Sequence, residues 1–157
     1  MRKELHEALR GHPFIREFQP QHIEKLAEIV QEARFERDQI IFRERDASSF
    51  LYLIVSGKVA LEVTALGRTV RVQTLSDGEL LGWSSVLPSE GKFFQARALG
   101  AVRALVFDGA RLLELCEQDC TFGYTLMRRL LGIVADRMQA TRVQLLDMYS
   151  PAGVKEP

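Results

Sequence analysis

Residues 50–63 read Phe-Leu-Tyr-Leu-Ile-Val-Ser-Gly-Lys-Val-Ala-Leu-Glu-Val, two apolar runs around a Ser-Gly-Lys turn. Runs of β-branched, aromatic and aliphatic residues are typical of strands, and the glycine marks the turn between them. The pattern recurs along the chain, with predicted strands at Ile40–Phe42, Phe50–Val55, Val59–Val63, Val70–Leu75, Phe93–Ala98 and Arg103–Phe107. Short strands at this spacing predict an antiparallel barrel or jelly roll.

Helical patterns flank the predicted strands on both sides. Pro20 stands where a first helical turn tolerates proline, and an amphipathic stretch follows it. After the strands, Asp108 and Asp119 are predicted helix caps, and a long helix is expected from about Thr121 to Tyr149. The expected fold is mainly β with flanking helices: a barrel or jelly roll followed by a long C-terminal helix.

A chain of 157 residues has room for one domain. Within it we expect an N-terminal helical segment at residues 1–33 and a β-roll with a ligand pocket at 34–107. The C-terminal helices occupy 108–150, and residues 151–157 form a tail.

Composition and motifs narrow the class of function. Lys plus Arg (21) balance Asp plus Glu (21), which removes the simplest electrostatic argument for a nucleic-acid partner. No apolar run reaches the roughly 18–20 residues of a membrane span, and no signal peptide opens the chain. The sequence therefore predicts a cytoplasmic protein without a membrane partner. Without a nucleophile motif or a phosphate-binding loop, we expect no enzyme.

Histidine and cysteine placement argues against a metal centre. The three histidines, His6, His12 and His22, all precede the predicted barrel, so they cannot form a metal site inside it. Cys116 and Cys120 are too few for an iron–sulfur cluster. The alternatives left open for them are buried free thiols or a redox pair, and haem sensing through a histidine also stays open.

The long predicted helix carries an apolar seam with the heptad spacing of a coiled coil. Its members alternate four and three residues apart: Met127, Leu131, Val134, Met138, Thr141, Leu145 and Met148. A second stripe (Leu126, Leu130, Ile133) lies beside it. We assign the second stripe to the chain's own barrel and the seam to a second copy, which predicts a parallel homodimer. The alternative is that both stripes pack within one monomer.

In the order and spacing of several motifs, the chain resembles the cyclic-nucleotide-binding domains of the Crp–Fnr regulator family. The motifs are His12-Pro13-Phe14, Ile40–Glu44, Tyr52–Val59, Leu75–Gly82 and Ala96-Arg97-Ala98, followed by the long helix. The resemblance covers about residues 12–149. It implies a double-stranded β-helix, that is a jelly-roll-like β-roll with a ligand pocket, followed by a long C-terminal dimerisation helix. It also implies a regulatory module for signal transduction that binds a small-molecule effector and dimerises through the long helix.

The resemblance also implies a pocket. Gly82 falls on the family's pocket glycine, because Leu75-x-x-Gly78-Glu79-x-x-Gly82 reproduces the turn before it. Trp83 then stands where the family has the glutamate that grips the ribose 2′-hydroxyl, and Lys92 stands near the place of the phosphate-binding arginine. Thr141 falls on the helix position that contacts the purine. The implied ligand-binding residues are Gly82, Trp83, Ser84, Ser85, Lys92, Phe93, Phe94 and Thr141.

These departures from the family leave three interpretations open. In the first interpretation, the pocket still binds a cyclic nucleotide such as cyclic AMP, but through different contacts. The base stacks on Trp83, Phe93 and Phe94, and Lys92 contributes its charge. Alternatively, the pocket takes a different small effector. In the third interpretation the aromatic side chains fill the pocket, and the chain is a ligandless dimerisation or adaptor protein. No other cofactor is expected.

The family's transcription factors carry a helix-turn-helix after the long helix. Here only Pro151–Pro157 follows Ser150, which is too short for that motif. We therefore expect no direct DNA binding, unless the sequence is part of a longer regulator. The arginines of the long helix (Arg128, Arg129, Arg137, Arg142) are interpreted as solvated or salt-bridged, and no motif identifies a downstream protein partner.

Overall fold

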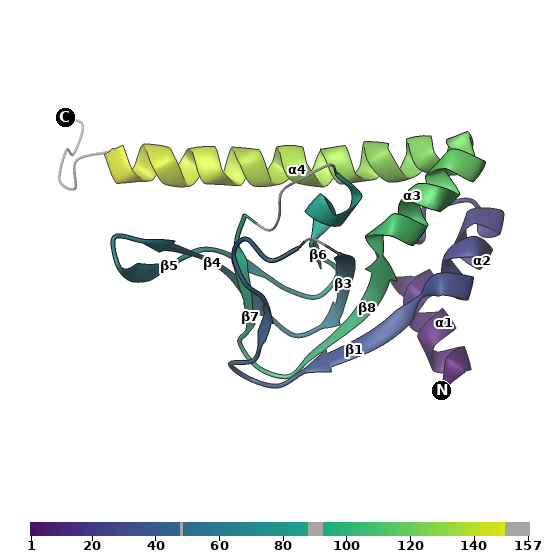
Figure 1. Ribbon diagram of the computed structural model, residues 1–157, viewed down its shortest axis with the longest axis horizontal. Helices are drawn as coiled ribbons and strands as arrows, with labels where there is room; N and C mark the ends of the chain where they lie inside the picture. The colour runs from purple at the N-terminus through teal and green to yellow at the C-terminus, as the bar shows by residue number, and fades with distance from the viewer. Residues whose placement is uncertain (48, 88–92, 150–157) are drawn as a thin grey trace, which may run out of the picture.

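The computed structural model describes residues 1–47, 49–87 and 93–149 and shows a β-roll with helices at both ends of the chain (Figure 1). Two helices come first, α1 (Arg2–Gly11) and α2 (Pro20–Ile29). The strands are β1 (Gln31–Phe35), β2 (Ile40–Phe42), β3 (Phe50–Ser56), β4 (Val59–Ala65), β5 (Arg68–Leu75), β6 (Leu80–Leu81), β7 (Gln95–Ala98) and β8 (Val102–Asp108). A 3-10 turn, η1 (Trp83–Val86), follows β6, and helices α3 (Gly109–Gln118) and α4 (Cys120–Tyr149) follow β8.

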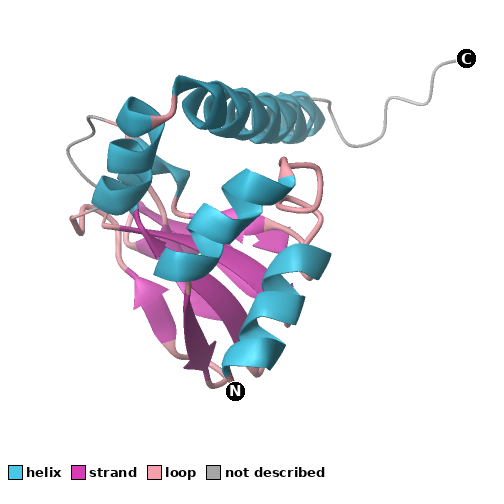
Figure 2. Ribbon diagram, turned by 90° about the vertical axis from the view of Figure 1, so that its right-hand side faces the viewer, coloured by secondary structure: helices cyan, strands magenta, loops and turns pink. Residues whose placement is uncertain are grey.

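The strands form two four-stranded antiparallel sheets, in the orders β1-β8-β3-β6 and β2-β7-β4-β5. One core cluster lies between the two sheets and includes Ile54, Leu61 and Leu75. A larger cluster joins the first sheet to the helices through side chains such as Leu53, Leu105 and Phe122. Figure 1 and Figure 2 show the long helix α4 along the top of the strands and the shorter helices at one end of them. The prediction of a mainly β fold, a β-roll with flanking helices and a long C-terminal helix is confirmed.

The helix caps form as the sequence predicts. The Asp108 carboxylate accepts a hydrogen bond from the Ala110 N–H at 2.9 Å and begins α3. The Asp119 carboxylate accepts from the N–H groups of Thr121 (3.1 Å) and Phe122 (3.2 Å) and begins α4. These bonds satisfy amides that have no partner within the helix. Asp108 therefore encodes the start of α3, and Asp119 encodes the short break between α3 and α4.

The N-terminal part of the chain differs from the expectation. Helices α1 and α2 both lie within the helical segment expected at residues 1–33, but β1 begins at Gln31, before the boundary expected at residue 33. The sequence of β1, Gln-Glu-Ala-Arg-Phe, contains no β-branched residue and so has no local strand signal. Its pairing with β8, from Gln31 opposite Val106 to Phe35 opposite Val102, makes it a strand.

Helix α4 runs along one side of the whole molecule (Figure 1). Its first half is held down by the buried side chains of Phe122, Leu126 and Leu130, whereas every residue from Met138 to Tyr149 is exposed. Arg129 anchors the same half to the loop before α2: it pairs with Glu17, and its guanidinium lies 5.2 Å from the ring centroid of Phe14. Within the described residues, no helix combines the length and apolar character needed to cross a bilayer.

Candidate functional site

A small cavity, open to solvent on one side, lies between the β-roll and α4, and five of the predicted site residues line it. These five are Gly82, Trp83, Ser84, Phe93 and Phe94. Phe42, Leu61 and Leu81 contribute the β-roll wall, and Arg137 enters from α4. The cavity measures about 20 Å³, which is room for about one water molecule. The side chains of the site therefore already fill most of the space.

The turn at Gly82 aims the residues after it into this cavity. Gly82 has φ +81°, a conformation that glycine adopts without strain, and η1 starts directly after it. The Ser85 N–H closes the turn on the Gly82 carbonyl at 3.0 Å. Ser85 itself does not line the cavity: it is buried against Gly109, where an added Cβ would lie 2.3 Å from the Ser85 carbonyl oxygen.

Two aromatic rings form a tilted pair at the cavity. The ring centroids of Trp83 and Phe93 are 6.1 Å apart with an interplanar angle of 34°. Phe93 is 58% exposed, so it lies at the opening, whereas Phe94 packs against the cluster between the sheets. This arrangement offers aromatic surface at the mouth of the site, where a planar ligand would first make contact.

Arg137 is a cavity-lining residue that the sequence analysis did not predict. Its guanidinium donates a hydrogen bond to the Leu80 carbonyl oxygen of β6. Burial lowers the pKa of Arg137 to about 10, and attraction to Glu79 opposes this. The Glu79 carboxylate is engaged elsewhere, accepting from the Ser76 N–H at 2.7 Å. The site thus contains a half-buried cation whose hydrogen-bond partner is a neutral carbonyl group.

A sequence signal for Arg137 does exist. The stripe Leu126, Leu130 and Ile133, which the sequence assigns to the barrel, continues at the same helical spacing to position 137. Following that stripe places Arg137 against the β-roll. Thr141, the helix residue implied by the resemblance, does not line the cavity; it is exposed, and its hydroxyl donates to the Arg137 carbonyl oxygen at 2.9 Å. Lys92 lies outside the described residues.

The chemistry that the described lining offers is simple. It contains one cation, one hydroxyl group, several aromatic rings and aliphatic side chains, without a carboxylate or an imidazole. Among the described residues, no three His, Cys, Asp or Glu side chains gather as metal ligands. Such a lining is suited to binding an anion with an attached apolar or aromatic group.

The histidines and cysteines lie away from the cavity. His12 donates to the Ile54 carbonyl oxygen at 2.9 Å and accepts from the Phe14 N–H, and burial lowers its pKa. His22 bonds the Asp119 carboxylate at 3.1 Å. Cys116 and Cys120 are free thiols beside the start of α4, and burial raises the pKa of Cys116.

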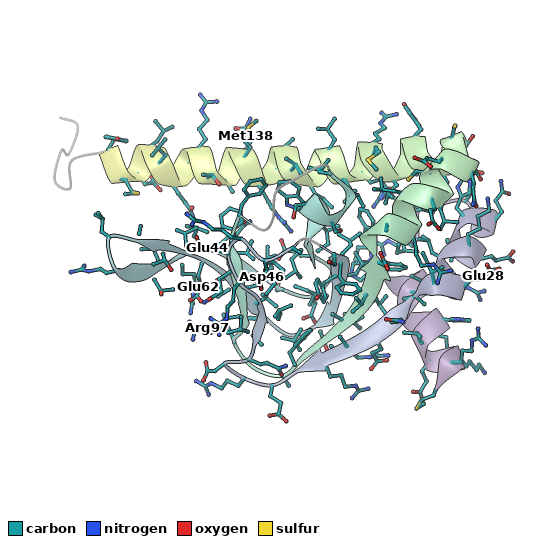
Figure 3. The ribbon with its side chains drawn as sticks, viewed as in Figure 1. Glu28, Glu44, Asp46, Glu62, Arg97 and Met138 are labelled. Carbon is teal, nitrogen blue, oxygen red and sulfur yellow. The ribbon has the colours of Figure 1, made fainter. Side chains whose placement is uncertain are left out.

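The predicted seam lies along α4, and four of its apolar side chains are exposed: Leu131, Met138, Leu145 and Met148. Figure 3 shows Met138 on the side of α4 that faces away from the β-roll. Tyr124, one heptad before Leu131, is exposed as well and extends the stripe. Met127 and Val134 are half-buried and, with Leu131, form one wall of an apolar groove of about 310 Å³ beside η1.

Comparison with known proteins identifies the fold family. The family model for the cyclic nucleotide-binding domain matches residues 32–119. The cyclic AMP receptor protein of Thermus thermophilus is 29% identical over 133 residues, which cover 84% of this chain and 56% of that protein. A putative potassium channel protein of Rhodopseudomonas palustris is 28% identical over 99 residues, 62% of this chain and 23% of that protein.

The chain thus spans about half and about a quarter of these two curated relatives. Among solved structures, a putative cyclic nucleotide-binding protein from Geobacter metallireducens is 29% identical, with a TM-score of 0.74 over 84% of this chain and 96% of that one. A cyclic nucleotide-binding domain from Methylobacillus flagellatus, 18% identical, has a TM-score of 0.79 over 94% of this chain and 83% of that one. The chain belongs to the cyclic nucleotide-binding domain family.

Proposed function

We propose that the protein is a non-enzymatic, cytoplasmic regulatory module that binds a small anionic effector of the cyclic-nucleotide type and signals through a homodimer. The observation that carries this proposal is Arg137, a cation from α4 that lies in a cavity otherwise built by the β-roll. A ligand in that cavity would contact both parts of the molecule. Its binding would therefore bias how α4 sits on the β-roll.

The anion partner follows from the electrostatics of the site. A buried guanidinium is costly unless it is paired, and the partner of Arg137 is the neutral carbonyl of Leu80. Hydrogen bonds to a charged group contribute about 1.5–3 kcal/mol, against about 1 kcal/mol for neutral pairs. An effector phosphate would therefore be a better partner than Leu80. We propose Lys92 as a second cation, and Arg137 in place of Thr141 as the helix contact.

The aromatic surface supports a nucleotide as the effector. A base that enters from solvent would meet Phe93 and Trp83, and stacking is worth about 1–3 kcal/mol per base. The likeness to the Thermus cyclic AMP receptor protein supports the same ligand class. Because the cavity is only about 20 Å³, binding requires Trp83, Phe93 or Arg137 to move.

Calorimetric titration with cyclic AMP tests the proposal. We expect micromolar binding that falls ten- to a hundredfold in Arg137→Gln and in Lys92→Ala. Arg142→Gln is the matched control, because Arg142 is an exposed arginine on the same helix. Loss of affinity in the control variant, or unchanged affinity in Arg137→Gln, would contradict the assignment of the anion site.

The homodimer is tested on the seam. Val134→Glu brings two like charges together in a parallel dimer, so we expect the variant to sediment as a monomer. Val143→Glu is its control, since Val143 is 57% exposed on the same helix but lies off the seam. A Val134→Glu protein that still sediments as a dimer would show that another surface makes the contact.

The filled cavity favours a second candidate function. With about 20 Å³ of free space, the aromatic side chains and Arg137 could serve only to close the β-roll, leaving a ligandless dimerisation module. Absence of heat and of any melting-temperature shift up to millimolar cyclic AMP, with an intact dimer, would support this function or a different effector.

A further inference from the structure

Trp83 forms part of the wall of two separate spaces. On one side it lines the effector cavity with Phe93, Phe94 and Arg137. On the other side it lines the apolar groove of about 310 Å³, together with Val86, Leu87, Met127, Leu130, Leu131 and Val134. One indole therefore separates the site of the proposed function from the helix surface that carries the seam.

The groove is continuous with that seam. Its α4 wall includes Met127, Leu131 and Val134, three successive seam positions. Leu131 is 68% exposed and Leu87, on the opposite wall, is 45% exposed, so the groove presents apolar surface to solvent. A second copy that pairs along the seam would pass over these residues, and it would cover apolar area that otherwise stays in water.

We propose that the α4 helix of a second copy covers this groove and that Trp83 transmits effector binding to that interface. The proposal rests on the proposed function, because it needs both an effector in the cavity and a dimer along the seam. It assigns Trp83 a role that the family glutamate implied by the resemblance would not have. A carboxylate has no reason to enter an apolar groove, whereas an indole does.

The volumes give the direction of the coupling. The cavity has no space for a nucleotide, while the groove on the far side of the indole has about 310 Å³. An entering effector therefore pushes Trp83 toward the groove, where the ring contacts Leu131 and Val134 and adds apolar surface for the second copy to cover. The effector strengthens the dimer, and by linkage the dimer binds the effector more tightly by the same factor.

Fluorescence makes this step directly observable, because Trp83 is the only tryptophan in the chain. We would titrate cyclic AMP while recording tryptophan emission and acrylamide quenching, and measure the dimer dissociation constant by sedimentation with and without cyclic AMP. We expect the emission to change with the calorimetric midpoint and the dimer to tighten about tenfold, within the range of typical coupling.

Two variants separate the parts of the proposal. Trp83→Leu keeps an apolar wall and leaves Arg137 in place, but it loses the stacking contribution of the indole. Cyclic AMP should therefore bind about ten- to a hundredfold more weakly, and saturating cyclic AMP should no longer change dimer affinity. Leu87→Gln places a polar group in the groove, away from cavity and seam, and should weaken the dimer about tenfold. Leu66→Gln is its control, since Leu66 is fully exposed at the β4–β5 turn.

The possible outcomes distinguish failure of the coupling from failure of the proposed function. If cyclic AMP binds but leaves both tryptophan emission and dimer affinity unchanged, the coupling is wrong while the proposed function stands. If Leu87→Gln dimerises like the unaltered protein, the second copy does not cover the groove. If cyclic AMP does not bind at all, the proposed function fails, and the coupling fails with it.

Discussion

Replacing Arg137 by methionine should leave the protein at least as stable while removing its anion site. Arg137 lies against apolar side chains of the cavity, and its guanidinium makes a hydrogen bond to the Leu80 carbonyl. Methionine is unbranched and apolar and adapts to irregular spaces, so it can occupy much of the volume of the arginine stem. The substitution therefore exchanges a half-buried charge for an apolar group.

The magnitude follows from two opposing contributions. Burial lowers the pKa of Arg137 from 12.5 to about 10, and at about 1.4 kcal/mol per pKa unit this disfavours the half-buried cation by about 3 kcal/mol. Arg137→Met removes that penalty. It also removes the donor to the Leu80 carbonyl, which costs about 1–3 kcal/mol. The net change is a gain of about 0–2 kcal/mol in the free energy of unfolding.

Urea unfolding and calorimetry of the same variant check both halves of this reasoning. Arg137→Met should show an unchanged or higher midpoint and an affinity for cyclic AMP that is about ten- to a hundredfold lower. Arg142→Met, at an exposed position, should change neither the midpoint nor the affinity. Leu130→Ala, which removes a buried packing residue, should lower the free energy of unfolding by about 2–5 kcal/mol and gives the scale for comparison. A loss of more than about 1 kcal/mol in Arg137→Met would refute the view that stability does not require this charge.

Two further predictions concern stability. Gly109→Ala should cost about 1–3 kcal/mol in urea unfolding, because the new Cβ would lie 2.3 Å from the Ser85 carbonyl oxygen and force η1 to move. At Gly132, in the middle of α4, an added Cβ would meet no neighbouring atom within 4 Å. Gly132→Ala should therefore stabilise the protein by about 0.5–1 kcal/mol. If both alanine variants changed stability equally, the close contact at Gly109 would not be the cause. Burial lowers the pKa of His12 below 6.5, so the unfolded chain binds its proton first as pH falls. Stability should therefore decline from about pH 6.5 downward, and His12→Gln should show a shallower decline between roughly pH 7 and pH 5; an identical slope would exclude His12 as its source.

Local patterns in the sequence predict most of the fold. The β-branched residues of β3 and β4 and the turn glycine Gly57 predict these two strands. Asp108 and Asp119 predict the starts of the two C-terminal helices. Strand β1 could not be found this way, because only its pairing with β8 makes its polar sequence extended. Elements that depend on their own residues can thus be predicted from the sequence, whereas a strand that depends on pairing with a distant strand cannot.

The residues of the candidate site differ in the same way in how well the sequence predicts them. The resemblance places Gly82, Trp83 and the two phenylalanines at a pocket, because its motif lies along one stretch of chain, and the structure brings them together. Arg137 comes from a helix far away in the sequence, and an arginine on a helix is more often solvated than buried. Thr141 shows the opposite error: its hydroxyl bonds its own helix, which is the ordinary behaviour of a helical threonine.

The pairing of Trp83 with Arg137 leads to a reversal experiment. The resemblance implies a glutamate at position 83 that grips the ribose 2′-hydroxyl, and with an indole there the described cavity lining holds no carboxylate beside Arg137. Trp83→Glu would restore an acceptor beside the guanidinium in the same cavity. If the site binds cyclic AMP, the unaltered protein should bind 2′-deoxy cyclic AMP almost equally well, whereas Trp83→Glu should prefer the ribose form about ten- to a hundredfold. Trp83→Gln, which offers a neutral acceptor, should show a smaller preference. Strong discrimination by the unaltered protein would mean that an acceptor from another part of the chain already reaches the ribose, and Trp83 would then not occupy the place of the glutamate.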